Sequence, residues 1–348
     1  MKRVISISLW LLLCIPFFTA CVQEESTPNG TVEVEGVTDR VQIGITFDTF
    51  VLERWIRDRD VFVYTATQLG ADVIVQNANG DVERQVAQIE EFVRQGKDAI
   101  VIVPVDSYAL REVIGQVNNA GIPIISYDRL IQNVRTDLFI TVNSRMVGME
   151  MAAVLKEQLP DGGNVVMITG PEKDTNSRMV AEGFREALRR SNLIIIDEIM
   201  VRTWTPEYGL HAANEALDRH NQIDAIMSGN DGLAGFVVQA LSQRQLAGTV
   251  LVTGQDADIE ACQRVVEGTQ VMTVYKPIEP LAARAAEFAV RLANGEELLE
   301  VNETIHNNVG DIPFFSLLPV AVTRENIEEV IIDSGFHLRE DVFRNVMD

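Results

Sequence analysis

The feature that most constrains this chain is a regular alternation of short apolar runs and amphipathic segments, which begins at Val41. Most of the apolar runs are continuous and rich in Val and Ile, which is typical of parallel strands covered on both faces. The runs lie at 41–47, 72–76, 98–104, 122–126, 138–142, 164–170, 193–199, 223–229, 249–254 and 270–275. Helices are predicted at 52–69, 82–95, 107–119, 144–158, 176–190, 206–218, 232–244, 258–267 and 277–295. This alternation predicts an α/β fold.

The ten predicted strands fall into two series of five, and the second series starts after the polar pair at 143–144. Each series alternates with helices, which predicts two doubly wound parallel-sheet lobes. The long helix expected within 276–297 follows a finished lobe and has to pack elsewhere. We expect it to cross back to the first lobe, so that several strands form a hinge. The predicted lobes are therefore 41–143 plus 276–297, and 144–275 plus 298–348.

The 348-residue chain is strongly acidic, with 51 Asp and Glu against 29 Lys and Arg and a formal charge of −22. A surface of that sign repels phosphate backbones and anionic lipid headgroups, so we expect no nucleic-acid partner. Three cysteines are too few for a disulfide framework, and four histidines without paired spacing do not indicate a zinc site. We therefore expect neither a metal nor a cofactor.

The N-terminal segment has the layout of an export signal. Lys2 and Arg3 give it a positive start, and an apolar run from Val4 to Phe18 follows. This run is shorter than the about 20 residues of a comfortable membrane span. We therefore expect residues 1–20 to be a cleaved signal peptide. An uncleaved membrane anchor is the alternative.

The segment FTAC (18–21) resembles the bacterial lipoprotein box, in which the cysteine is lipidated and becomes the new N-terminus. Phe18 stands where Leu is usual. The residue after the cysteine is valine, not the aspartate that retains lipoproteins at the inner membrane. We expect an exported protein anchored through Cys21 on the extracytoplasmic face of a bacterial membrane. Residues 21–40 are acidic and lack an apolar period, which predicts a solvated tether.

Polar and aromatic residues follow several of the predicted strands. In an open parallel sheet, ligands bind beyond the carboxyl ends of the strands. Two lobes that face each other across that edge form a cleft. The candidate ligand-binding residues at this edge are Arg54, Trp55, Asp128, Arg129, Asp174, Asn176, Trp204, Asn230, Asp256 and Lys276.

These residue types suit a neutral, polyhydroxylated ligand. Asp accepts hydrogen bonds from hydroxyls, Arg donates through a planar fork, and Asn offers both a donor and an acceptor. An indole packs against the C–H face of a pyranose. The glycines of GNDGLAG (229–235) do not form a phosphate-binding loop, because no Lys follows at the required spacing. The pattern indicates binding and no enzymatic reaction.

Six segments together resemble the periplasmic D-xylose-binding proteins of ABC importers. These belong to the type I periplasmic sugar-binding-protein family, which also includes ribose and galactose/glucose binders. The segments are LERWIRDRD (52–60), QNANGDVERQVAQIE (76–90), SYDRLI (126–131), GNDGLAG (229–235), TGQDAD (253–258) and MTVYKPI (272–278). The resemblance implies two hinged lobes that close on one monosaccharide, with D-xylose as the expected sugar, and an ABC permease as the partner that receives it.

The resemblance also implies residue roles. The residues that match sugar-contacting positions are Arg54, Arg129, Asn230, Asp256 and Lys276, and those that match aromatic walls are Trp55 and Trp204. Asp174 and Asn176 fall in the matching loop, which is one residue longer in this chain. Thr49 and Val51 replace polar residues of the xylose proteins, and such positions can separate a pentose from a hexose. The calcium loop of the galactose/glucose branch has no counterpart.

Several candidates have a structural alternative. Asp128 and Arg129 could form an ion pair that caps a surface loop, and Trp55 could belong to the core. Asn230 and Asp231 are both common types at a helix N-cap. On the resemblance, we assign Asp231 to the cap and Asn230 to the ligand.

Other functions remain open at the level of sequence. The same lobes could bind glucose, arabinose or ribose, or could signal to a histidine kinase or chemoreceptor. Transcription regulators of the lac type share this body, but they need an N-terminal helix-turn-helix and a basic face. A glycosidase could use two of the clustered carboxylates, although no catalytic Ser, Cys or His motif accompanies them. We expect a monomeric binding protein and not an enzyme.

Overall fold

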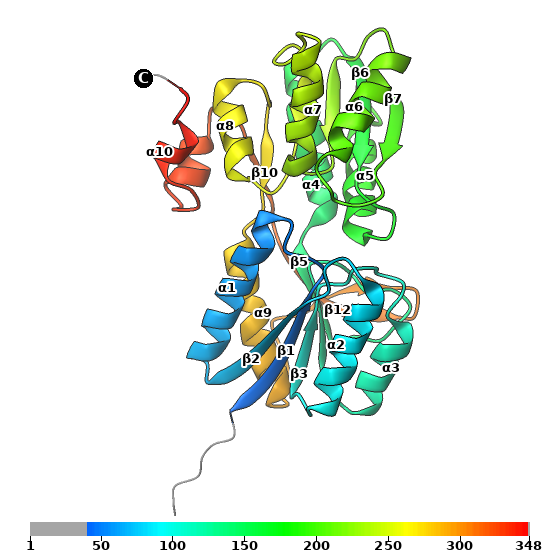
Figure 1. The fold of residues 1–348 in the computed structure, drawn as a ribbon, viewed down its shortest axis with the longest axis vertical. Helices are drawn as coiled ribbons and strands as arrows, with labels where there is room; N and C mark the ends of the chain where they lie inside the picture. Colours follow the sequence, from blue (N-terminus) through cyan, green and yellow to red (C-terminus); the bar gives the residue numbers. More distant parts are fainter. Residues whose placement is uncertain (1–39, 347–348) are drawn as a thin grey trace, which may run out of the picture. The chain divides into compact units, whose positions relative to one another are not determined.

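The computed structural model describes residues 40–346 of the chain (Figure 1). The predicted signal peptide, Cys21 and all but the last residue of the predicted tether lie outside the described residues. Within 40–346, no helix combines the length and the apolar character needed to cross a membrane. The same residues contain no group of three or more His, Cys, Asp or Glu that could hold a metal ion.

A seven-stranded sheet forms the centre of the first lobe. Its order is β11-β12-β5-β4-β3-β1-β2, and only the β11–β12 pair is antiparallel. The strands are β1 (Val41–Phe47), β2 (Ala71–Asn77), β3 (Ala99–Ile102), β4 (Ile124–Tyr127), β5 (Leu138–Val142), β11 (Glu303–His306) and β12 (Asp311–Leu317). The helices of this lobe are α1 (Glu53–Gln68), α2 (Val82–Arg94), α3 (Arg111–Asn119) and α9 (Ile278–Ala293).

Helices cover both faces of this sheet, which explains its continuous apolar strands. Successive strand residues point to opposite faces. Val101 therefore packs in the apolar cluster that contains Phe288 of α9. Its neighbour Ile100 packs in a different cluster, with Phe92 of α2 and Val113 of α3. The buried β1 segment ends at Phe47, which directs the following loop toward the carboxyl edge of the sheet.

The second lobe contains a four-stranded parallel sheet in the order β7-β6-β8-β9. Its strands are β6 (Gly163–Thr169), β7 (Leu193–Met200), β8 (Ala225–Ser228) and β9 (Leu251–Thr253), and its helices are α4 (Ser144–Gln158), α5 (Thr175–Leu188), α6 (Tyr208–Arg219), α7 (Asp231–Gln243) and α8 (Ile259–Glu267). Helices α4 and α5 approach closely because glycine faces the contact. A Cβ on Gly148 would lie 1.9 Å from the carbonyl oxygen of Val180.

The tenth predicted strand does not complete a five-stranded second sheet, so that part of the prediction was wrong. β10 (Thr273–Tyr275) forms a separate antiparallel pair with β13 (Val320–Val322). One isolated bridge, between Thr253 and Met272, joins the residue before β10 to β9. The C-terminal elements η1 (Glu328–Ile332) and α10 (Arg339–Val342) pack with α8 in one apolar cluster, which completes the second lobe.

The prediction that residues 298–348 belong to the second lobe was also wrong for β11 and β12, which lie in the sheet of the first lobe. β12 runs parallel to β5, and the rings of Phe139 and Phe314 stack with centroids 5.4 Å apart. The apolar DIPFFSL segment therefore extends the first sheet instead of joining the second lobe. Three connections pass between the lobes: β5 to α4, β10 to α9, and β12 to β13 (Figure 1).

Candidate functional site

All ten predicted ligand residues line one small cavity between the lobes. The cavity has a volume of about 30 Å³. The first lobe contributes Arg54, Trp55, Asp128 and Arg129, and the second contributes Asp174, Asn176, Trp204, Asn230, Asp256 and Lys276. The sequence analysis missed four further lining residues, Leu52, Val142, Ser144 and Gln255. Each of these lies at or just beyond the end of a strand or the start of a helix, which is the signal that could have found them.

Arg54 lies on the first turn of α1 and is almost completely buried. Its Nη2 donates to Asp128 Oδ1 over 2.9 Å. Two further carboxylates lie farther away, with Nε 3.5 Å from Asp58 Oδ2 and Nη1 3.7 Å from Asp256 Oδ1. Burial alone would lower the pKa of Arg54, but these three carboxylates outweigh it and raise that pKa well above its usual value. Arg54 is therefore a permanent cation held by one short and two long contacts.

Asp58 is a member of this network that the sequence analysis missed. It follows Arg54 by one helical turn, is fully buried, and accepts a hydrogen bond from the hydroxyl of Tyr127. Burial raises the pKa of Asp58 to about 6, although Arg54 and Tyr127 both lower it. The i,i+4 spacing of Arg54 and Asp58 was the available signal, because such pairs lie on one helix face.

Arg129 is held more tightly than Arg54. Its Nη1 donates to Asp48 Oδ2 over 2.6 Å and to the carbonyl oxygen of Pro104 over 3.0 Å. Its Nε lies 2.8 Å from Asp174 Oδ2 in the second lobe. Burial would lower the pKa of Arg129, but Asp174 and Asp48 outweigh it and raise that pKa further. The predicted alternative of a surface ion pair was wrong for Arg129, because its side chain is only 4% exposed.

The start of α5 supplies two of the second-lobe residues. Asp174 is the N-cap and accepts from the backbone N–H of Asn176 over 2.9 Å. Its Oδ2 also accepts from the indole Nε1 of Trp204 over 2.9 Å. Asn176 Nδ2 donates across the cleft to the carbonyl oxygen of Asp128 over 2.8 Å and to Asp128 Oδ2 over 3.0 Å. The loop before α5 therefore closes directly against the first lobe.

The two tryptophans line the cavity from different lobes. Trp55 is 1% exposed and packs edge-on against Phe47, so it also belongs to the core of the first lobe. The guanidinium of Arg54 lies 4.2 Å from the centroid of its ring. The ring of Trp204 lies over Gly170, where a Cβ would come within 2.1 Å of the indole. Glycine at position 170 is therefore needed for Trp204 to sit at this wall.

The assignment of Asn230 and Asp231 was reversed for the helix cap. Asn230 has an extended backbone, and its Oδ1 accepts from the N–H of Leu233 over 2.9 Å, so it is the N-cap of α7. Asp231 is already helical and fully buried, and it accepts from Thr273 Oγ1 over 2.6 Å and from Gln270 Nε2 over 2.8 Å. Asn230 still lines the cavity, and its Nδ2 is the group that remains for a ligand.

Asp256 lies after β9 and pairs with the ammonium of Lys276. The backbone of Asp256 has a φ of 104°, and that of Asp128, after β4, has a φ of 62°. Non-glycine residues adopt this left-handed region rarely, and such strain collects at functional sites. The two carboxylates that flank Arg54 from opposite lobes are therefore both presented by strained backbone.

Unpartnered polar atoms are concentrated in this cavity. Within 40–346, five buried side-chain atoms lack a hydrogen bond, and three of them belong to cavity residues. Trp55 Nε1 and Asn176 Oδ1 have no partner, whereas Asp256 Oδ1 is paired as an ion with Lys276. Native structures leave few such groups unsatisfied, and each costs about 1–3 kcal/mol. The cavity therefore offers donors and acceptors that a polar ligand could satisfy.

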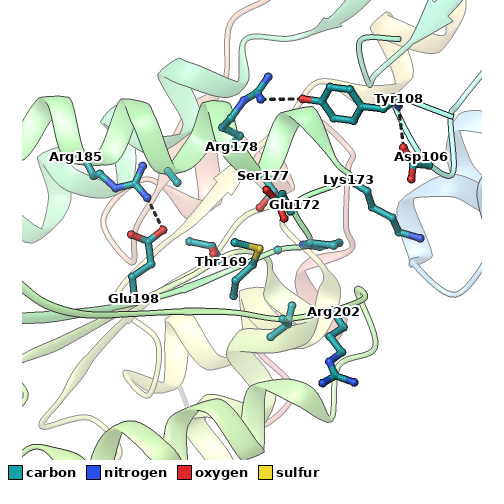
Figure 2. A pocket seen from close by; sticks show the side chains of 15 residues that line it. Asp106, Tyr108, Thr169, Glu172, Lys173, Ser177, Arg178, Arg185, Glu198 and Arg202 are labelled. Atoms are coloured by element: carbon teal, nitrogen blue, oxygen red, sulfur yellow. Dashed lines mark hydrogen bonds and ion pairs between the residues drawn. The ribbon is translucent and has the colours of Figure 1, made fainter. Parts of the chain in front are cut away.

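A larger pocket, of about 680 Å³, lies elsewhere (Figure 2). It is lined by none of the ten predicted residues. Most of its charged side chains are exposed or already paired: Arg178 donates to the hydroxyl of Tyr108 over 2.8 Å, and Arg185 pairs with Glu198. Size alone would favour this pocket, but convergent buried polar groups favour the smaller cavity as the binding site.

The model of the periplasmic binding protein domain family matches residues 43–297 of this chain. The chain belongs to the periplasmic binding protein family. The chain is 38% identical over 307 residues to the D-xylose-binding periplasmic protein of Escherichia coli (strain K12), covering 87% of this chain and 92% of that protein. It is 37% identical over 308 residues to the D-xylose-binding periplasmic protein of Haemophilus influenzae, with the same coverage of both chains.

Solved structures of periplasmic binding proteins share the fold. A solute-binding protein of Clostridium phytofermentans with bound β-D-glucose matches with a TM-score of 0.80 at 27% identity, covering 86% of this chain and 99% of that one. A carbohydrate transporter solute-binding protein of Chloroflexus aurantiacus in complex with D-glucose matches with a TM-score of 0.79 at 25% identity, covering 86% of this chain and 98% of that one. The type I fold expected from the resemblance is confirmed, and the chain is a periplasmic sugar-binding protein.

Proposed function

We propose that this periplasmic binding protein captures D-xylose between its lobes and delivers it to an ABC permease without chemical change. The observation that carries the proposal is a pair of buried polar atoms without a partner, Trp55 Nε1 and Asn176 Oδ1, in a cavity lined by arginines, aspartates and two indoles. The names of the relatives that are 37–38% identical support a pentose as the ligand.

Each group has a definite role in this proposal. Asp256 and Asp128 accept hydrogen bonds from sugar hydroxyls, and Arg54 donates to hydroxyl or ring oxygens. Arg54 suits this role because two of its three carboxylate contacts are long and can yield to a ligand. Trp204 and Trp55 pack against the two C–H faces of the ring. A micromolar dissociation constant corresponds to about −8 kcal/mol, which a few buried hydrogen bonds and two stacked walls can supply.

The described conformation is closed, so sugar entry requires the lobes to separate. The cavity of about 30 Å³ is lined by side chains of both lobes. Direct contacts also seal the cleft: Ser107 N donates to Lys173 O over 3.1 Å, and Leu130 N donates to Thr175 Oγ1 over 3.2 Å. Hinge closure around the ligand is a familiar transition for two-lobed proteins, and the three connections between the lobes form the hinge.

Titration calorimetry of the mature protein with D-xylose, D-glucose, L-arabinose and D-ribose tests the proposal. We expect D-xylose to bind most tightly. Asp256→Ala should weaken binding at least 100-fold. It also leaves the buried ammonium of Lys276 without its carboxylate, so the thermal transition of the sugar-free protein should fall as well. The matched control is Asp60→Ala, at an exposed aspartate on α1. Absence of binding to all four aldoses, or recovery of a converted product after incubation with sugar or xylosides, would overturn the proposal.

We further propose that the chain is a monomer tethered to the membrane by a lipid on Cys21, which lies outside the described residues. The motif at 18–21 and the acidic composition of 21–40 support this assignment. Metabolic labelling with an alkyne palmitate in a bacterial host should mark the wild type and not Cys21→Ser. Equal labelling of both, or release of the wild type as a free protein, would contradict the anchor. Size-exclusion chromatography with light scattering of residues 22–348 tests the monomer.

A further inference from the structure

Asp231 is a buried carboxylate that neither caps α7 nor lines the binding cavity. It is 1% exposed, and its side chain accepts three hydrogen bonds. They come from Thr273 Oγ1 over 2.6 Å, from Gln270 Nε2 over 2.8 Å and from the backbone N–H of Asp258 over 3.2 Å. A buried carboxylate is costly unless donors surround it, and here they do. Asp231 therefore connects the start of α7 to β10 and to the loop after β9.

The loop after β9 contains two consecutive strained residues. Asp256 has a φ of 104° and Ala257 a φ of 53°, and no other two neighbouring non-glycine residues within 40–346 both have a positive φ. Such conformations persist only where the surrounding structure holds them in place. The side chain that this turn presents is the carboxylate of Asp256, which lines the cavity and pairs with Lys276. The contacts that hold the turn therefore decide where Asp256 meets a ligand.

The two backbone N–H groups that follow Asp256 both depend on Asp231. The N–H of Ala257 donates to Thr273 Oγ1 over 3.2 Å, and the N–H of Asp258 donates to Asp231 Oδ2. A hydroxyl has one proton to donate, and that of Thr273 goes to Asp231, so the oxygen of Thr273 is left to accept from Ala257. Asp231 thus holds Asp258 directly and holds Ala257 through the hydroxyl of Thr273.

We propose that Asp231 is a positioning residue for sugar binding, which holds Asp256 in place through Thr273 and the backbone N–H groups of the turn. This inference rests on the proposed function, in which Asp256 accepts hydrogen bonds from sugar hydroxyls. Asp231 does not line the cavity, so its effect on affinity passes through the position of Asp256. Without the contacts to Asp231 the turn relaxes out of its strained conformation, and a bound sugar has to restore that conformation.

Calorimetry with D-xylose tests the inference through small changes at Thr273. Thr273→Val removes the hydroxyl and nearly keeps the volume, so it should weaken binding about tenfold. Thr273→Ser keeps the hydroxyl and should bind within about threefold of the wild type. Burial raises the pKa of Asp231 to about 7, although Arg264 lowers it, so the titrations are run at about pH 8, where this carboxyl is ionised.

The matched control is Thr253→Val, on β9. Thr253 is also fully buried, does not line the cavity, and its hydroxyl has no hydrogen-bond partner among the described residues. The same substitution there should change the affinity for D-xylose by less than about twofold. A loss for Thr253→Val as large as that for Thr273→Val would overturn the inference, because loss of any buried hydroxyl in this region would then suffice.

A double-mutant cycle separates positioning from a general loosening of the lobe. In the Asp256→Ala background, Thr273→Val should weaken D-xylose less than about twofold further, because the carboxylate that it positions is gone. Asp231→Asn, which turns an amide toward these donors, should weaken the wild type at least about tenfold and add as little in that background. Losses that persist in full with Asp256→Ala would show a structural role only and would refute positioning.

The outcomes separate this inference from the proposed function. If the wild type binds D-xylose and Thr273→Val binds equally well, positioning through Asp231 is refuted and the proposed function stands. If the wild type does not bind D-xylose, the proposed function fails first, and the inference fails with it.

Discussion

Arg54 and Arg129 are both buried cations of the first lobe, yet their surroundings differ. Arg129 makes three contacts of 3.0 Å or less, to a carboxylate of its own lobe, a carbonyl oxygen and a carboxylate of the other lobe. Arg54 makes one such contact and lies 3.5 Å or more from its two other carboxylates. Arg129 is therefore held by short contacts at Nη1 and Nε, whereas two of the three carboxylate contacts of Arg54 are long and can yield to a ligand.

The difference teaches that one cleft can separate two tasks. The pair of Arg129 and Asp174 joins the lobes and fixes their distance. The cluster around Arg54 can adjust because it contains a second cation, Lys276, and a carboxylate, Asp58, whose pKa burial raises to about 6. A buried charge that can gain a proton or share a second cation costs less when its partner moves away. We therefore assign Arg129 mainly to closure and Arg54 mainly to the ligand.

Replacement of the two arginines gives the largest expected effect. Arg129→Met leaves Asp48 and Asp174 buried without their cation, so it should lower the free energy of unfolding by about 3–5 kcal/mol. Arg54→Met should cost less, because Asp58 can protonate and Asp256 retains Lys276, but it should abolish sugar binding. Urea denaturation at pH 7 and calorimetry measure both. A stability loss for Arg54→Met as large as that for Arg129→Met would break the comparison.

The pH dependence of stability sharpens the role of Asp58. Its pKa is raised to about 6 in the folded protein. The folded protein therefore retains a proton that the unfolded chain releases at lower pH, and stability falls as pH rises from about 4 to 6. The free energy of unfolding falls by about 3 kcal/mol in total, because each unit of the pKa difference corresponds to about 1.4 kcal/mol. Asp58→Asn removes this loss, so from pH 4 to pH 7 its free energy of unfolding should improve by that amount relative to the wild type.

Denaturation of Asp58→Asn and wild type at the two pH values checks this prediction. The control is Asp60→Asn, two residues along α1, where the side chain is 62% exposed. It should follow the wild type at both pH values. If Asp58→Asn also follows the wild type, Asp58 is ionised in the folded protein without cost, and the adjustable character of the Arg54 cluster is lost.

A smaller effect is expected at the Trp204 side of the cavity. Gly170→Ala places a Cβ about where the Trp204 ring now lies, at 2.1 Å, and should displace the indole from Asp174. Sugar affinity should fall about tenfold, or about 1.4 kcal/mol, as a stacked wall is lost. Gly115→Ala, on α3 with no atom within 4 Å of the added Cβ, is the control.

Tryptophan fluorescence in a Trp55→Phe background reads this effect on Trp204 directly. Sugar should change the emission of Trp204 in the background protein, and Gly170→Ala should reduce that change. An unchanged spectrum on addition of a sugar that binds would show that Trp204 does not contact it.

Much of the fold could be predicted because parallel strands buried on both faces leave a local signature. β1 was expected at 41–47 and lies at Val41–Phe47, and the other apolar runs also contain strands. Sheet order has no such signature. β10 and β12 are apolar like the other strands, but their apolar character does not show which strands they pair with. Their partners are β13 and β5, which lie far away in sequence.

The site was predictable to the same extent and for a related reason. The rule that ligands bind beyond strand carboxyl ends, together with the family resemblance, placed ten residues that meet around one cavity. Asp58 was missed because its partner, Tyr127, lies on β4 and is distant in sequence from α1. Asn230 and Asp231 were exchanged because only the backbone angles, extended at one and helical at the next, decide which side chain caps α7.

The three chain crossings between the lobes have a mechanical consequence. A single linker would let one half swing and swivel freely about a few bonds. Three backbone connections restrict the relative motion of the lobes to bending about the hinge and oppose twisting. Each closure of the lobes then returns the guanidinium of Arg129 to the carboxylate of Asp174, so a ligand meets binding groups that are already positioned.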